Sequence, residues 1–142
     1  MIERTQFGTH TIWTEEETGF ICFVQNGTFS EADAISVLEI LAKHGETTAP
    51  GEPVLFLADY RTASDVTHGA RKVLANAPLR GAPVFYGAFG ASFAFRVAAN
   101  LVFSAMMLIS RSKITLQMEA EEAEARAWLN QQKLAYAARK NG

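Results

Sequence analysis

The spacing of apolar residues predicts a β-hairpin at the start of the chain. Apolar and polar residues alternate over Thr9–Thr14, and Phe20–Val24 is a run rich in aromatic and β-branched side chains. Glu15–Gly19 supplies the turn between these two strands. The dipeptide Asn26-Gly27 is expected to close the second strand.

After the hairpin, the apolar spacing becomes that of helices. The first helix is expected to begin at the N-cap Ser30 and to end at Gly45 in a left-handed conformation. Three further helices are expected at Thr67–Asn76, from Ser92 onward, and at Glu119–Lys133.

Three short apolar runs separate these helices and are expected to be buried strands. They cover Val54–Ala58, Val84–Ala88 and Ile114–Met118. The first run ends at Asp59, and a polar loop over Tyr60–Val66 is expected to follow it. The order β-β-α-β-α-β-α-β-α predicts an α/β domain with a mixed, largely parallel sheet covered by helices.

Length and charge narrow the classes of function. The chain has 142 residues, which predicts a single domain over residues 1–142. We expect an ordered core at about 9–135 and a frayed basic tail. The formal net charge of −2 argues against a nucleic-acid partner.

The sequence also predicts no membrane span and a cytoplasmic location. Residues 92–109 are mostly apolar, but Arg96 and Asn100 interrupt them, which is unlike a spanning helix. Met1–His10 has no apolar core of the secretory type, and a lone cysteine, Cys22, fits a reducing compartment. Cys22 lies in an apolar strand and is expected to be inert core.

No pattern typical of an enzyme or a metal site is visible. The three histidines, His10, His44 and His68, fall in different predicted elements, and no Gly-x-Ser-x-Gly elbow is present. We therefore expect no catalytic residue, no metal and no cofactor.

Two local motifs carry a family resemblance. Phe56-Leu57-Ala58-Asp59 ends a strand before the polar loop to the Thr67 helix, and the Ile114–Met118 strand precedes an acidic helix with Glu124-Ala125-Arg126-Ala127-Trp128-Leu129. With the element order, these motifs resemble the STAS superfamily over roughly Gly19–Lys133. That superfamily includes bacterial anti-sigma-factor antagonists and SpoIIAA-like proteins, which are related to the Sec14 lipid-transfer fold. The resemblance implies a non-enzymatic regulatory or protein-interaction domain.

The first candidate site comprises Asp59, Ser64, Asp65 and Thr67. Ligands of open α/β sheets bind beyond the carboxyl ends of the strands, where this segment is expected. It would bind a protein partner or accept a phosphate; alternatively, Asp65 or Thr67 simply caps a helix. STAS regulators carry Asp-Ser-Ser-Gly here with a phosphorylated serine. The stretch Asp65-Val66-Thr67-His68-Gly69 is one residue longer.

The second candidate site is the helix that begins at Ser92. Its polar residues recur in steps of four on one narrow stripe, and most of the remaining surface is apolar. We expect Phe95, Phe103 and Met106 to be surplus to what one sheet face needs. They would form a homodimer or partner interface, or bind a lipid-like or other apolar small molecule. A third possibility is that the C-terminal helix or the hairpin covers them.

Overall fold

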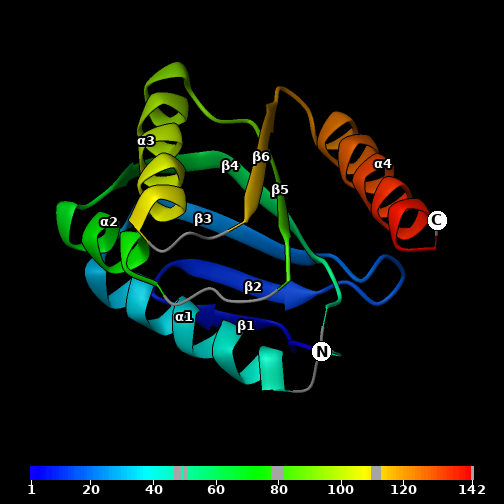
Figure 1. Cartoon of the computed structure of the whole chain (residues 1–142). Coiled ribbons are helices and arrows are strands. Elements are labelled where there is room, and N and C mark those ends of the chain that lie inside the picture. The colour runs from blue at the N-terminus through cyan, green and yellow to red at the C-terminus, as the bar shows by residue number, and fades with distance from the viewer. Residues whose placement is uncertain (47–48, 50, 78–81, 110–112, 142) are drawn as a thin grey trace.

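The computed structural model describes residues 1–46, 49, 51–77, 82–109 and 113–141. These residues form a mixed six-stranded sheet with four helices (Figure 1), so the predicted α/β class is confirmed. The strands are β1 (Thr5–Phe7), β2 (His10–Thr14), β3 (Ile21–Phe29), β4 (Val54–Val66), β5 (Val84–Phe89) and β6 (Ile114–Glu119). The helices are α1 (Glu31–Glu46), α2 (His68–Ala75), α3 (Phe93–Ile109) and α4 (Glu122–Asn141).

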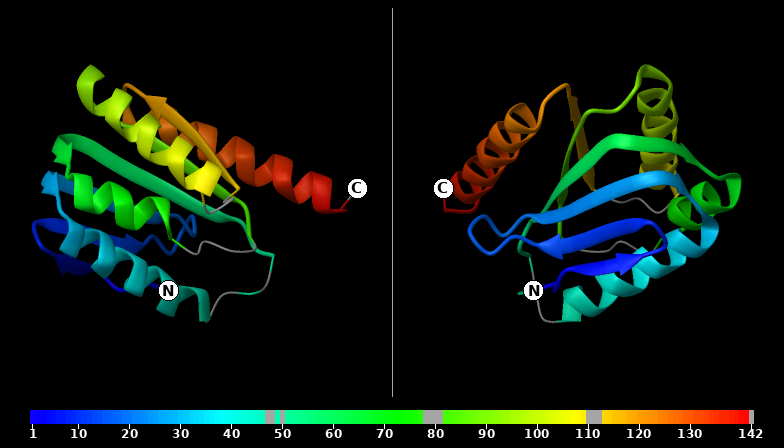
Figure 2. Two further views of the ribbon diagram at one scale, coloured as in Figure 1. Left: turned by 60° about the vertical axis from the view of Figure 1, so that its left-hand side comes forward. Right: turned by 180° about the vertical axis from the view of Figure 1, so that it is seen from behind.

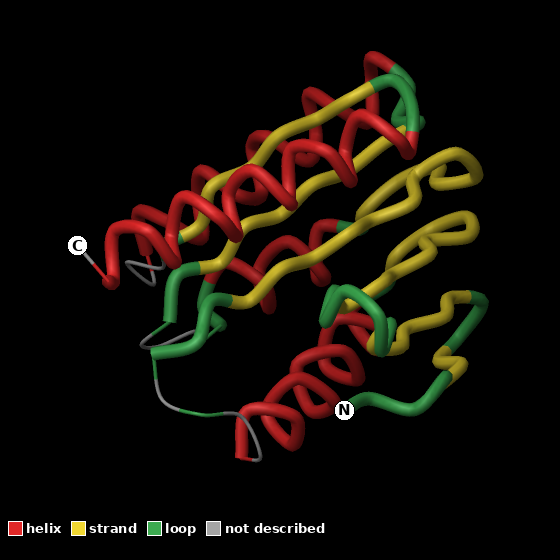
Figure 3. The backbone as a smooth tube through the Cα atoms, turned by 90° about the vertical axis from the view of Figure 1, so that its right-hand side faces the viewer, coloured by secondary structure: helices red, strands yellow, loops and turns green. Residues whose placement is uncertain are grey.

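The strands lie in the sheet in the order in which they occur along the chain. β1, β2 and β3 pair antiparallel, whereas β3, β4, β5 and β6 pair parallel. Consecutive parallel neighbours joined by crossovers of one hand place every connecting helix on the same face. Accordingly, α1, α2 and α3 cover one face, and α4 covers the other (Figures 2 and 3).

The strand periodicity of two divides the core between these faces. In β4, Phe56 and Ala58 pack on the three-helix side, whereas Leu55 and Leu57 pack on the side of α4. Cys22 also belongs to the α4 side, where burial raises the pKa of its thiol to about 11. The prediction that Cys22 is core is confirmed.

The strands β3 and β4 are longer than their sequence pattern predicts. β3 continues through Asn26-Gly27 to Phe29, and β4 continues through the expected loop to Val66. The register between them shifts on both sides of Asn26-Gly27, and Gly27 has a φ of 79°. A bulge built on a left-handed glycine therefore lies where the sequence predicts the end of a strand.

Other boundaries differ as well. β1 is a strand that the sequence pattern does not predict. Gly45 lies inside α1 and is not among the left-handed glycines, so it does not cap that helix. α4 begins later than predicted and continues to Asn141, through the tail expected to fray.

Tyr136 explains why the last turns of α4 are helical. Its ring packs edge-on against Phe85 of β5, and its hydroxyl donates a hydrogen bond to the carbonyl of Gly51 at 2.7 Å. These contacts hold the end of α4 against the sheet and the chain just before β4.

A buried histidine joins the hairpin to α1. His10 is fully buried, and its Nδ1 accepts a hydrogen bond from the Asn26 backbone N–H at 3.0 Å. Its Nε2 therefore carries the hydrogen and donates to Asp33 at 3.0 Å. The Asp33 carboxylate also accepts from the Ser30 N–H, while the Ser30 hydroxyl accepts from the Asp33 N–H. This reciprocal cap confirms Ser30 as the N-cap and gives the His–Asp pair a structural role.

An ion pair fastens α4 to the hairpin turn. The Arg126 guanidinium donates to both carboxylate oxygens of Glu15 at 2.8 Å, and its Nε donates to Glu122 at 2.8 Å. This fork lowers the pKa of Glu15 from 4.5 to about 2. Residues more than a hundred positions apart are thus held together across the α4 face.

We predict that Glu15→Gln lowers the free energy of unfolding at neutral pH by about 1–2 kcal/mol, because Arg126 loses a charged bidentate acceptor. A carboxyl group that is more acidic when folded stabilises the protein above its unfolded pKa, and that contribution disappears as pH falls through the folded value. Urea unfolding should therefore show the wild type and the variant converging between pH 4.5 and about 2. Glu16→Gln, in the same turn but exposed, is the control and should change little at any pH. A Glu15→Gln difference that does not vary with pH would contradict the prediction.

Candidate functional site

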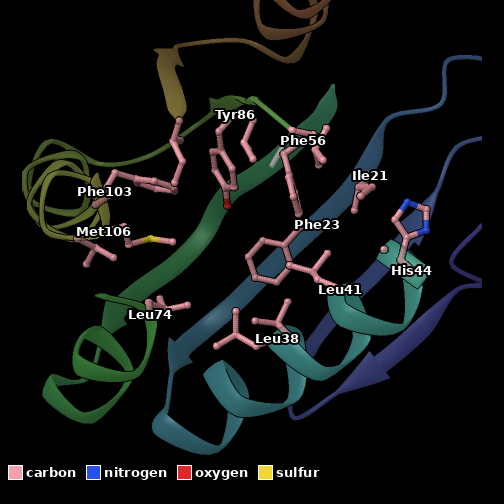
Figure 4. Close-up of a pocket in the computed structure, with 18 of the residues that line it drawn as sticks. Ile21, Phe23, Leu38, Leu41, His44, Phe56, Leu74, Tyr86, Phe103 and Met106 are labelled. Atoms are coloured by element: carbon pink, nitrogen blue, oxygen red, sulfur yellow. The ribbon is translucent and has the colours of Figure 1, made fainter. Parts of the chain in front are cut away.

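A cavity of about 600 Å³ lies between the sheet and the three helices α1, α2 and α3 (Figure 4). Strands β3, β4 and β5 form its floor, and the inward sides of the helices form its walls. Its lining is largely aliphatic and aromatic, and its members include Ile21, Phe23, Leu38, Leu41, Phe56, Leu74, Phe103 and Met106. The volume and the chemistry are those of a small-molecule site.

Two tyrosines place a polar pair within this apolar lining. The hydroxyls of Tyr60 on β4 and Tyr86 on β5 are 2.6 Å apart and share a hydrogen bond. Figure 4 shows the Tyr86 hydroxyl directed into the cavity. Burial raises the pKa of both phenols well above their usual range, so both are neutral over the physiological range of pH.

Aromatic rings fix the position of these two hydroxyls. Phe95 lies against the ring of Tyr60, and Phe103 lies against the ring of Tyr86, each with centroids 4.7 Å apart. Phe56 stacks on Tyr86 from the neighbouring strand at 5.2 Å. The hydroxyl pair is therefore rigidly held by rings from β4 and α3.

Other polar groups lie at the margins of the cavity. The Gln25 amide is buried and donates at 3.0 Å to the carbonyls of Gly27 and Asp65, which ties the bulge in β3 to the end of β4. His44, near the end of α1, and Glu52, just before β4, also contribute to the lining.

The cavity holds no fixed positive charge among the residues described. Its lining contains no lysine or arginine in that part of the chain. Burial, helped by the positive charge of the N-terminus, lowers the pKa of His44, which keeps the imidazole neutral at pH 7. The described part of the lining therefore offers no fixed positive charge to an anionic group.

The predicted residues Phe95, Phe103 and Met106 all line this cavity. Phe95 and Met106 are only 3% and 5% exposed, so they are not surplus on the outer surface. That part of the expectation is wrong, because the inward face of α3 runs through Phe95, Ala99, Val102 and Met106 at helical spacing.

The outward face of α3 is apolar at other positions. Phe93 and Leu108 are 81% and 82% exposed, and Val97 and Leu101 are also exposed. Neither α4 nor the hairpin covers this face: α4 packs on the opposite side of the sheet, and the hairpin forms the edge away from β6. The expectation of a homodimer or partner interface stays a prediction.

The segment from Asp59 to Thr67 is strand rather than loop up to Val66. Asp59 forms a bidentate ion pair with Arg61 that lowers the pKa of the Asp59 carboxyl against the opposing effect of burial. Ser64 lies 3.3 Å from the Thr28 hydroxyl across the strands, and exposed Asp65 lies 3.6 Å from Arg71.

Thr67 is the N-cap of α2. Its hydroxyl accepts a hydrogen bond from the Ala70 N–H at 3.1 Å. Ser64, Asp65 and Thr67 lie close along the chain at the end of β4, but each has a local partner. Their role as a phosphoacceptor or partner surface stays a prediction.

We predict that Thr67→Ala lowers the free energy of unfolding by about 1 kcal/mol, because the first turn of α2 loses its side-chain acceptor. Thr67→Ser, which keeps the hydroxyl, is the matched control and should retain most of the wild-type stability in urea unfolding. Equal losses in the two variants would show that the methyl group, rather than the cap, supports this position.

A second hollow lies between β5, β6 and the end of α4. Its lining includes Lys113, Arg139 and Lys140, whose side chains are exposed. It is more open to solvent than the cavity under the helices, and its cations are those of a solvated surface. The cavity under the helices, with its largely apolar lining, is the better candidate.

Sequence reasoning did not find the tyrosine pair. Tyr60 falls in the segment expected to be a loop, and Tyr86 falls inside a predicted strand. The available signal was the alternation Phe56, Ala58, Tyr60, which places the tyrosine on the same face as the core phenylalanine once β4 is extended.

No known protein-family model and no curated protein matches this chain. Among the described helices, none combines the length and apolarity needed to cross a bilayer.

Proposed function

We propose that this protein is a binding domain for a lipophilic small molecule, which occupies the cavity between the sheet and helices α1, α2 and α3. The observation that carries the proposal is the cavity itself, with about 600 Å³ lined largely by aliphatic and aromatic side chains. Close packing is the rule in protein interiors, and a space of this size lies well beyond the usual packing voids.

The chemistry of the walls determines what such a ligand gains on binding. Hydrocarbon transferred from water to apolar walls gains about 0.8 kcal/mol per methylene. Affinity should therefore rise about four-fold for each methylene added to a ligand, until the cavity is full. The regulatory role implied by the STAS resemblance stays a prediction, and its candidate residues Asp59, Ser64, Asp65 and Thr67 are not among the residues that line this cavity.

The test is binding of the neutral fluorophore phenylnaphthylamine, displaced by alcohols of increasing chain length. We predict an increase in fluorescence with wild type and displacement that strengthens with chain length before reaching a plateau. No binding of the fluorophore or of any alcohol by folded wild-type protein would overturn the proposal.

A pair of variants on α3 locates the binding. Val102 faces the cavity and is 6% exposed, whereas Leu101 points outward and is 62% exposed. Val102→Trp fills the cavity and should weaken binding by about ten-fold or more, while Leu101→Trp should leave it within about two-fold of wild type. Circular dichroism checks that each variant is folded; if Val102→Trp is not, Val102→Phe replaces it. Equal effects of the two substitutions would show that the binding lies elsewhere.

A further inference from the structure

The tyrosine pair indicates which lipophilic molecules the cavity selects. Each phenol supplies one hydrogen, and the bond between Tyr60 and Tyr86 uses only one of the two. Neither hydroxyl makes another hydrogen bond within the described residues. One O–H donor thus remains for a further acceptor, inside a lining that is otherwise mostly hydrocarbon.

The position of the pair suits a ligand group rather than a packing role. Tyr60 and Tyr86 come from neighbouring strands and point to the same face, and Phe95 and Phe103 of α3 hold their rings. The donor is therefore preorganised, so a ligand oxygen placed there binds without ordering a mobile side chain.

The described residues around the cavity offer no cationic partner for an anionic head group. A carboxylate or phosphate would lose its hydration and find neither lysine nor arginine among the described lining residues. A quaternary ammonium group would be drawn to aromatic faces, but it cannot accept the hydrogen that the phenol pair offers.

We propose that the cavity selects a neutral lipophile carrying one hydrogen-bond-accepting oxygen, a hydroxyl or a carbonyl, and that the Tyr60–Tyr86 pair binds that oxygen. This inference rests on the proposed function, since it assigns the ligand class of the same cavity. It adds a prediction that the proposed function alone does not make. Removing the two tyrosine hydroxyls should weaken the affinity for ligands that carry a hydrogen-bond acceptor, but not the affinity for ligands that lack one.

The experiment compares probes that share a ten-carbon chain: decane, decanol, decanone, decanoate and decyltrimethylammonium. Each competes with phenylnaphthylamine at pH 7, below its micellar concentration, on wild type and on Tyr60→Phe/Tyr86→Phe. The double variant removes both hydroxyls and keeps both rings. It should weaken decanol and decanone by about five-fold and change decane by less than about two-fold.

Comparing one ligand across variants cancels the different hydration of decane and decanol, which would confuse a direct comparison of their affinities. Leu41→Ala is the control, because it alters a cavity wall on α1 that has no hydroxyl, and α1 supplies none of the rings that contact the two tyrosines. It should shift the affinities for decane and decanol by the same factor. If the double variant does not fold, Tyr60→Phe/Tyr86→Met, which also removes both hydroxyls, takes its place.

The outcomes separate this inference from the proposed function. Selective loss of decanol and decanone, with decanoate and decyltrimethylammonium at least about ten-fold weaker than decanol on wild type, supports the inference. Equal losses for decane and decanol would overturn it while the proposed function stands. If decanoate or decyltrimethylammonium binds wild type as tightly as decanol, the inference is likewise overturned and the proposed function stands. If no probe binds wild type, the proposed function fails and the inference fails with it.

Discussion

The sequential parallel pairing of β3, β4, β5 and β6 is the constraint on which the rest of the structure depends. Because the crossovers between neighbouring parallel strands all have the same hand, α1, α2 and α3 lie on the same face of the sheet. Three helices then share one side of a twisted sheet, and the space beneath them becomes the cavity. The opposite side is left to α4, which follows the last strand.

The two faces of the sheet are packed differently. On the α4 side, Phe20 and Leu129 are fully buried, and the ion pair between Arg126 and Glu15 fastens the helix to the hairpin turn. On the three-helix side, rings from β4, β5 and α3 surround a space instead of filling it. The α4 side is thus filled around Leu129, whereas the three-helix side surrounds a largely apolar cavity.

Local patterns in the sequence predicted most of the elements but not where β3 and β4 end. The apolar run of β5 and the Thr67 hydroxyl before α2 are local signals, and the structure has a strand at the first and an N-cap at the second. Asn26-Gly27 is an equally strong local signal for a turn. In the structure, however, β3 continues to pair with β4 on both sides of this dipeptide, which forms a bulge. The polar residues after Asp59 become strand for the same reason, since their partners lie about 37 residues earlier in the chain.

The sequence indicates that α3 belongs to the candidate site, but the expectation of which apolar side chains of α3 face outward is wrong. The stripe of Ser92, Arg96, Asn100 and Ser104 is exposed as expected. It leaves an apolar flank on each side, one containing Phe95 and Met106, the other Val97 and Leu101. Helical periodicity separates these flanks but cannot say which one meets the sheet. That choice depends on the sheet packed beneath them, which a single-sequence pattern does not contain.

The apolar lining of the cavity is the physical link between the fold and the proposed function. Its aliphatic and aromatic side chains face a hollow of about 600 Å³, so they lack packing contacts that a filled core would supply, and this lack is a free-energy cost. Water can relieve it only near polar groups such as the Tyr60–Tyr86 hydroxyls, because the other walls offer it few hydrogen bonds. An apolar guest relieves the cost along the entire lining, so ligand binding and the stability of the three-helix face are expected to be thermodynamically coupled.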